Sequence, residues 1–78
     1  MKEVKHTKTP CGAFGIKAYG TWECFMSREE YEAYLLDWIC STEGAERDRA
    51  VEATANLHRG IRFTDTDSGQ RGSIEDFV

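Results

Sequence analysis

The sequence has no apolar run long enough for a membrane-spanning helix, and charged residues make up 31% of the chain. Its first residues, Met-Lys-Glu-Val-Lys-His, lack the apolar core of a secretory signal peptide. The three cysteines are an odd number without short-range pairing, so a disulfide framework is not expected. We therefore expect a reduced, cytoplasmic protein. A chain of 78 residues predicts a single domain, residues 1–78.

The spacings typical of metal sites are also missing. The candidate ligands are Cys11, Cys24, Cys40, His6 and His58. No C-x₂-C or H-x₃-H pair brings two of them together locally, so we predict neither a metal nor another cofactor.

The run Asp65-x-Asp67-x-Gly69 is similar to the start of a calcium-binding loop. Such a loop needs Gly at its sixth position and Glu at its twelfth, where this chain has Gln70 and Asp76. An Asx-type turn is therefore predicted here instead.

No recognisable catalytic arrangement is present: the sequence lacks a phosphate-cradling glycine motif, a paired-carboxylate site and a Ser-His-Asp signature. Cys11, in a Pro-Gly turn, is the thiol expected to be exposed, while Cys24 and Cys40 lie beside apolar residues and are expected to react only after unfolding. A nucleophilic Cys11 would need His6 or His58 as a base. We predict a protein that is not an enzyme; the alternative is a small metal- or thiol-dependent protein that uses Cys11.

Residues 26–40 carry the strongest structural signal, which is that of an amphipathic helix. Ser27 stands three residues before Glu30, the spacing of a helix N-cap. Apolar residues then recur at helical spacing, at Tyr31, Tyr34, Leu35, Trp38 and Ile39. A second, alanine-rich helix is predicted over residues 45–58, ending at Gly60.

The remaining segments predict strands. Residues 14–25 read as a hairpin, and residues 4–8 and 61–64 as an edge strand and a late strand. A three-residue hairpin loop, 18–20, would put Ile16 opposite Trp22; a two-residue loop would put Ile16 opposite Glu23. The first register gathers the apolar residues on one face and is preferred. The order predicts an α+β fold, a small antiparallel sheet (edge strand, hairpin, late strand) covered on one face by two helices.

The expected core joins this sheet to the first helix. Tyr31, Leu35 and Trp38 are predicted to pack against Phe14, Ile16 and Trp22. The apolar residues of the C-terminal tail, Ile74, Phe77 and Val78, either dock on the sheet or bind a partner.

Charge is uneven along the chain, with net +2 over residues 1–25, −5 over 26–58 and −1 over 59–78. The helical side is therefore expected to be negative, which favours a protein partner with a basic surface. The residues proposed to bind it are Glu29, Glu32 and Asp37 around an exposed Leu36. The alternative is a nucleic-acid-associated regulatory protein that uses a basic sheet face. Its residues would be Lys5, Lys8, Lys17 and Arg62, with Tyr19 at the hairpin tip.

In its size, acidity and lack of a secretion signal or catalytic arrangement, the whole chain resembles small phage-encoded proteins that block bacterial defences, the anti-CRISPR proteins among them. The resemblance rests on no motif and assigns no residue a role. It implies a stoichiometric inhibitor in the host cytoplasm, one that occupies the basic nucleic-acid-binding surface of a defence complex.

Overall fold

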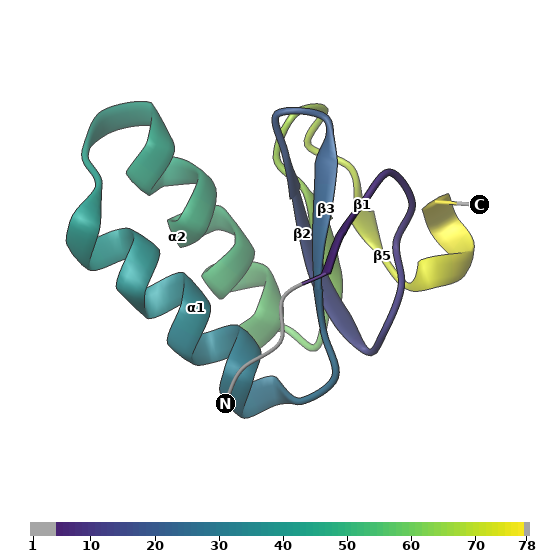
Figure 1. Ribbon diagram of the computed structural model, residues 1–78. Helices are drawn as coiled ribbons and strands as arrows, with labels where there is room; N and C mark the ends of the chain where they lie inside the picture. The colour runs from purple at the N-terminus through teal and green to yellow at the C-terminus, as the bar shows by residue number, and fades with distance from the viewer. Residues whose placement is uncertain (1–4, 78) are drawn as a thin grey trace.

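The computed structural model describes residues 5–77, which form a layer of two helices against one face of a five-stranded sheet (Figure 1). No helix within those residues combines the length and the apolar character needed to cross a bilayer. The α+β class is confirmed, as are the two helices on one side of the sheet.

The helices form where their sequence signals predict. Helix α1 spans Arg28–Ser41, and the Glu30 N–H donates to the Ser27 hydroxyl oxygen at 3.2 Å, which confirms the N-cap. Helix α2 spans Gly44–His58 and is followed by a left-handed Gly60, whose N–H donates to the Leu57 carbonyl. The two helices run antiparallel and place small α2 residues, Ala50 and Ala53, in the buried layer.

The sheet has the strand order β1-β3-β2-β4-β5. Its strands are β1 Lys5–Thr7, β2 Phe14–Ala18, β3 Thr21–Phe25, β4 Phe63–Asp65 and β5 Arg71–Gly72. Strand β1 is an edge strand, as expected, although Val4 of the predicted strand lies outside the described residues.

The prediction of an all-antiparallel sheet is wrong, because β2 and β4 pair in parallel. Strand β1 occupies the free side of β3, and the chain returning from the helices pairs with β2. Two antiparallel helices bring it back to the end of the sheet where β2 begins, and β4 therefore runs in the same direction as β2.

The preferred hairpin register is also wrong. The loop has two residues, Tyr19 and Gly20, both with positive φ (56° and 80°), and Ile16 lies opposite Glu23 rather than Trp22. Positive φ at both central positions is the conformation that matches the twist of a two-residue hairpin. The one-residue shift turns Trp22 and Cys24 to the face away from the helices.

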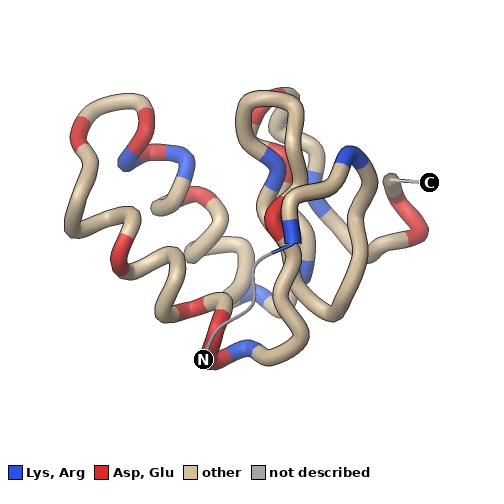
Figure 2. Tube along the Cα trace, in the orientation of Figure 1, with Lys and Arg blue, Asp and Glu red and all other residues tan. Residues whose placement is uncertain are grey.

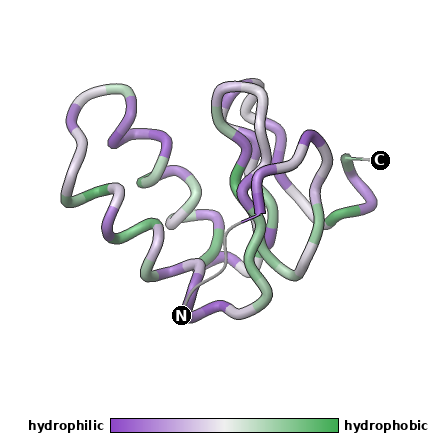
Figure 3. Tube along the Cα trace, in the orientation of Figure 1, coloured by the Kyte–Doolittle hydropathy of each residue, from purple (hydrophilic) through white to green (hydrophobic). Residues whose placement is uncertain are grey.

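That face is buried too, so the sheet carries two apolar clusters. The helix side contains Ile16, Phe25, Tyr31, Leu35, Ala50, Ala53 and Leu57; the far side contains Trp22, Cys24 and Phe63. Hydrophobic positions accordingly occur in both layers and again near the C-terminus (Figure 3). The predicted contact of Tyr31 with Phe14 is confirmed by ring centroids 5.7 Å apart, but Trp22 does not belong to this core and Trp38 is only half-buried.

The C-terminal segment covers the far side. A 3₁₀ helix, η1, spans Ile74–Phe77, and the Phe77 ring lies edge-on to Trp22 with a centroid distance of 5.0 Å. Ile74 and Phe77 thus dock on the sheet, while Val78 lies outside the described residues.

Candidate functional site

Acidic residues concentrate on the helical layer (Figure 2), and all four predicted partner-binding residues are exposed there. Leu36 exposes 61% of its surface. Glu29 and Glu32 precede Leu36 by seven and four residues and share its side of α1. Asp37 lies about 100° further around the helix and does not belong to this group. The Arg28 Nε is 3.0 Å from a Glu32 carboxylate oxygen; both side chains are exposed, so the pair contributes little to stability.

Leu36 borders a small apolar groove between the two helices, with a volume of about 180 Å³. Leu36 and Ile39 of α1 line one side, and Thr54 and His58 of α2 line the other, with Glu32 at the rim. The α2 residues were not predicted from the sequence, because their contribution to the groove depends on the angle at which the helices pack.

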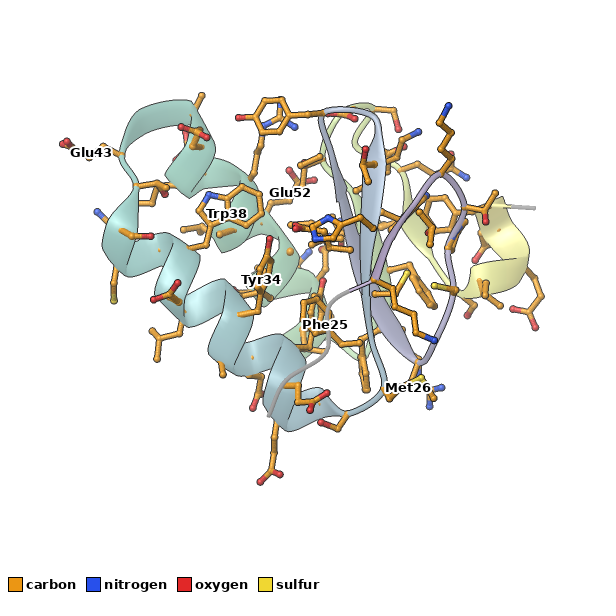
Figure 4. The ribbon with its side chains drawn as sticks, in the orientation of Figure 1. Phe25, Met26, Tyr34, Trp38, Glu43 and Glu52 are labelled. Atoms are coloured by element: carbon orange, nitrogen blue, oxygen red, sulfur yellow. The ribbon has the colours of Figure 1, made fainter. Side chains whose placement is uncertain are left out.

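A larger pocket, about 430 Å³, lies between α1 and the hairpin end of the sheet. Three aromatic or charged side chains come from the strands and the hairpin tip, His6, Tyr19 and Glu23, and two come from α1, Tyr34 and Trp38. Tyr34 and Trp38 project from α1 towards the sheet (Figure 4). Their ring planes meet at 71° with centroids 6.0 Å apart, which gives the pocket an aromatic corner.

Glu23 supplies the negative charge of this pocket. Its side chain is 19% exposed; one carboxylate oxygen accepts a hydrogen bond from the Tyr34 hydroxyl, and the other lies 3.4 Å from His6 Nδ1. Burial, followed by the hydrogen bond to Glu23 and the charge of that carboxylate, raises the pKa of Tyr34 well above its usual value. The phenol therefore stays protonated and holds the carboxylate in place.

The hairpin tip that carries Tyr19 is fixed to both α2 and the β4–β5 turn. The carboxylate of Asp67 accepts from the N–H groups of Tyr19 (3.0 Å) and Gly20 (2.8 Å) and from the Arg49 guanidinium (2.8 Å). The hydrogen bond from the Gly20 N–H has the largest effect on the pKa of Asp67, and the one from Arg49 has the next largest. Both lower it. Arg49 also lies 4.5 Å from the Tyr19 ring centroid, and the Tyr19 hydroxyl donates to Glu46. Tyr19 is therefore held in place where it lines the pocket, although 63% of its surface is exposed.

The cations of the alternative nucleic-acid surface are not brought together. Lys5 and Lys17 lie on the sheet face away from the helices, and Lys17 pairs with Asp65 at 3.7 Å. Arg62 instead stacks near the Phe14 ring (5.8 Å), which packs on the helix-side core. Lys8 is exposed beyond β1. Such a dispersed set lacks the continuous basic track that a single strand needs.

Cys24 is buried as predicted, whereas Cys11 and Cys40 have different surroundings from those expected. Cys11 is half-buried beside Cys24, and its N–H lies 3.2 Å from the Cys24 sulfur. Burial, followed by hydrogen bonding with Cys11, raises the pKa of Cys24 to about 11. Cys40 is exposed, so the expectation that it is buried is wrong; it lies on the outer side of α1, away from the sheet.

Neither histidine is positioned as a base beside Cys11. His6 pairs with Glu23 on the helix side of the sheet, whereas Cys11 packs on the far side, and His58 lines the groove between the helices. Over residues 5–77, no group of three or more His, Cys, Asp or Glu side chains gathers in a way that could hold a metal ion. The Asx turn is confirmed: Asp65 Oδ1 accepts from the N–H groups of Asp67 and Ser68.

The aromatic pocket was not predicted from the sequence, although one signal for it was present. The rejected two-residue loop places Glu23 on the face of Ile16, beside the aromatic stripe of α1. Comparison with known proteins adds no assignment: no family model, curated protein or solved structure matches this chain.

Proposed function

We propose that this protein is a non-enzymatic binding protein whose helical layer binds a basic surface of a protein partner. The observation that carries the proposal is the exposed Leu36 beside the α1–α2 groove, with Glu29 and Glu32 on the same side of the helix. An exposed apolar side chain beside two carboxylates suits a partner that presents an apolar side chain among lysines or arginines.

In its narrower form, the proposal is that the partner surface normally binds nucleic acid. An acidic protein that covers such a surface excludes the phosphate backbone from it, which makes the protein a stoichiometric inhibitor. The resemblance to phage-encoded inhibitors favours the cytoplasm of a bacterial host and, as the target, a nucleic-acid-processing defence complex such as a CRISPR effector. The dispersed cations on the sheet lend no comparable support to direct nucleic-acid binding.

The test measures binding to a panel of purified CRISPR effector complexes by biolayer interferometry. Each complex is presented free of target nucleic acid and again with its target bound. We expect one-to-one binding to the free form of a complex and loss of binding when the target occupies the basic channel. Binding to no member of the panel, or equal binding to both forms, contradicts the narrower proposal.

Charge reversal then tests the surface. Glu29→Lys with Glu32→Lys should weaken binding about tenfold or more, mainly through slower association. The matched control is Glu43→Lys with Glu75→Lys, two exposed residues away from the groove that change the net charge equally. Asp37→Lys alone should have a smaller effect because Asp37 lies off the groove side. Equal losses in the groove variant and the control would remove the groove from the interface.

A further inference from the structure

The pocket between α1 and the hairpin has a composition that the proposed function does not use. Two aromatic rings, Tyr34 and Trp38, form a corner, Tyr19 adds a third ring, and Glu23 places a carboxylate among them. Aromatic faces carry negative electrostatic potential, and several rings around one carboxylate form a favourable environment for an organic cation.

Charge around the pocket selects against anions. Glu23 lines it, Glu46 accepts from the Tyr19 hydroxyl, and the charge of Asp37 contributes to the raised pKa of Tyr34. Arg49 lies over the Tyr19 ring, but its guanidinium is already paired with Asp67 at 2.8 Å. His6 lies against Glu23 and carries charge only when it is protonated. The local field is therefore negative.

Glu23 is the acidic side chain that a cationic ligand meets in this pocket. One oxygen of Glu23 already accepts from Tyr34, and the other faces His6. A ligand that offers a diffuse positive charge gains from the carboxylate without needing a new hydrogen bond to it. Each carboxylate oxygen also has a second lone pair, so Glu23 can accept a hydrogen bond from an ammonium or guanidinium N–H while it keeps these contacts.

We propose that this pocket binds the cationic head group of a lysine or arginine side chain presented by a protein partner, with the head group held among Tyr34, Trp38 and Glu23. The site lies on the opposite side of α1 from the Leu36 groove. Binding at this site does not depend on binding at the groove. A volume of about 430 Å³ accommodates an ammonium, a trimethylammonium or a guanidinium group together with part of its alkyl stem.

The experiment is an NMR titration of the ¹⁵N-labelled protein, read at the indole N–H of Trp38. Trp22 is buried on the opposite face of the sheet, so its indole N–H is an internal control. The probes are choline, its neutral isostere 3,3-dimethylbutanol, glucose, and pentapeptides Gly-Ser-X-Ser-Gly with X as lysine, trimethyllysine, arginine or norleucine. Probe concentrations extend to about 100 mM, because a ligand this small reaches only about millimolar affinity.

We expect saturable shifts of the Trp38 indole with choline and with at least one cationic peptide, and none with norleucine or 3,3-dimethylbutanol. Equal shifts with the neutral isosteres would mean an apolar pocket, and saturation by glucose a sugar site; either overturns the proposal. Binding of choline but of no cationic peptide would overturn the assignment to a protein side chain. The absence of any saturable shift overturns the site itself.

Substitutions test the contribution of the Glu23 carboxylate separately from that of the Trp38 ring. Glu23→Gln retains a hydrogen-bond acceptor for Tyr34 and should weaken binding about tenfold. Trp38→Leu should weaken it by a similar factor, and because this variant lacks the indole probe, its titration is read at the backbone amide of Thr21, which also lines the pocket. Trp38→Phe keeps an aromatic face and should lose less than Trp38→Leu. Equal binding by Glu23→Gln and the unmodified protein would overturn the role of the carboxylate.

The Leu36 groove is tested separately from this pocket. The groove variant, Glu29→Lys with Glu32→Lys, should bind the cationic probes normally, because both residues lie on the other flank of α1. Failure of one site is therefore distinguishable from failure of the other. A groove variant that no longer binds choline would overturn the independence of the two sites.

Discussion

The two faces of the sheet are both buried, but they are covered in different ways. The helix side is covered by α1 and α2, which bury Tyr31, Leu35 and Leu57 against it. Among residues 5–77, the far side is covered by a short loop containing Cys11 and by the single turn of η1. A full helical layer thus stabilises one face, while a few aromatic contacts around Trp22 stabilise the other.

This difference explains the strand register. If the far side were exposed to water, placing Trp22 there would be costly, and all the apolar residues of the hairpin would favour one face. Because Phe63 and Phe77 form a second apolar cluster, Trp22 and Cys24 can turn away from the helices. The far cluster and the two-residue hairpin loop therefore depend on each other.

The largest effect is expected from removing the centre of the thinly covered face. Trp22 is 2% exposed and contacts Phe63 and Phe77 edge-on, so Trp22→Ala should cost about 3–5 kcal/mol in the free energy of unfolding. Trp38 is half-buried at the pocket rim, and Trp38→Ala should cost about 1–2 kcal/mol. Urea unfolding followed by circular dichroism measures both.

The Trp22→Ala result does not by itself distinguish the two hairpin registers, because Trp22 would be buried in either of them. A three-residue loop would have placed Trp22 in the helix-side core together with Phe14 and Ile16. Phe77→Ala is the discriminating control, since only the observed register joins η1 to Trp22. If Phe77→Ala leaves stability unchanged while Trp22→Ala unfolds the protein, Trp22 is not packed beneath η1.

Helix α1 was predictable because its signals are local. The Ser27 cap and the stripe that includes Tyr31 and Leu35 lie within 15 consecutive residues and need no knowledge of the rest of the chain. The register was not predictable in the same way, because it depends on Phe63 and Phe77, which lie 41 and 55 residues beyond Trp22. The parallel pairing of β4 likewise depends on β1 occupying the far edge of β3.

The two candidate sites differ in the same way: one depends on local signals and the other on segments far apart in the sequence. The exposure of Leu36 and its acidic neighbours followed from helical spacing alone. The aromatic pocket combines His6, Glu23 and Trp38 from three separate segments, and only the observed register turns Glu23 towards α1. The surface formed by one helix could therefore be predicted from the sequence, whereas the pocket formed between the two layers could not.

A moderate loss of stability is expected from a substitution of Asp67, in the β4–β5 turn that holds the hairpin tip and Arg49 of α2. Asp67→Asn weakens the acceptor shared by Gly20, Tyr19 and Arg49 and should cost about 1 kcal/mol at neutral pH, a modest loss because the group is solvent-accessible. The pKa of Asp67 is lowered in the folded state, so its contribution is present above the unfolded-state value and lost as the pH falls through the folded-state value.

The stability difference between Asp67→Asn and the unmodified protein should therefore shrink as the pH falls below about 4. Urea midpoints measured from pH 7 down to pH 2 follow this change. Asp48→Asn, at an exposed position on α2, is the control for loss of a surface charge. A difference that stays constant over the whole range would show that the charge of Asp67 does not stabilise the hairpin tip.

The smallest effect concerns thiol reactivity, which changes no contact in the folded protein but reports directly on the two faces. Cys40 is exposed on the helical layer, Cys11 is half-buried, and Cys24 lies beneath the far-side cover. Because burial raises its pKa to about 11, Cys24 is also poor in thiolate at pH 8. Reaction with a maleimide, followed by mass spectrometry of peptides, should modify Cys40 first, Cys11 more slowly and Cys24 last.

Cys40→Ser should abolish the fast phase alone, whereas Phe77→Ala should speed the modification of Cys24 by loosening its cover. If Cys24 reacts as fast as Cys40 in the folded protein, the far face is open to solvent and the two-cluster description fails.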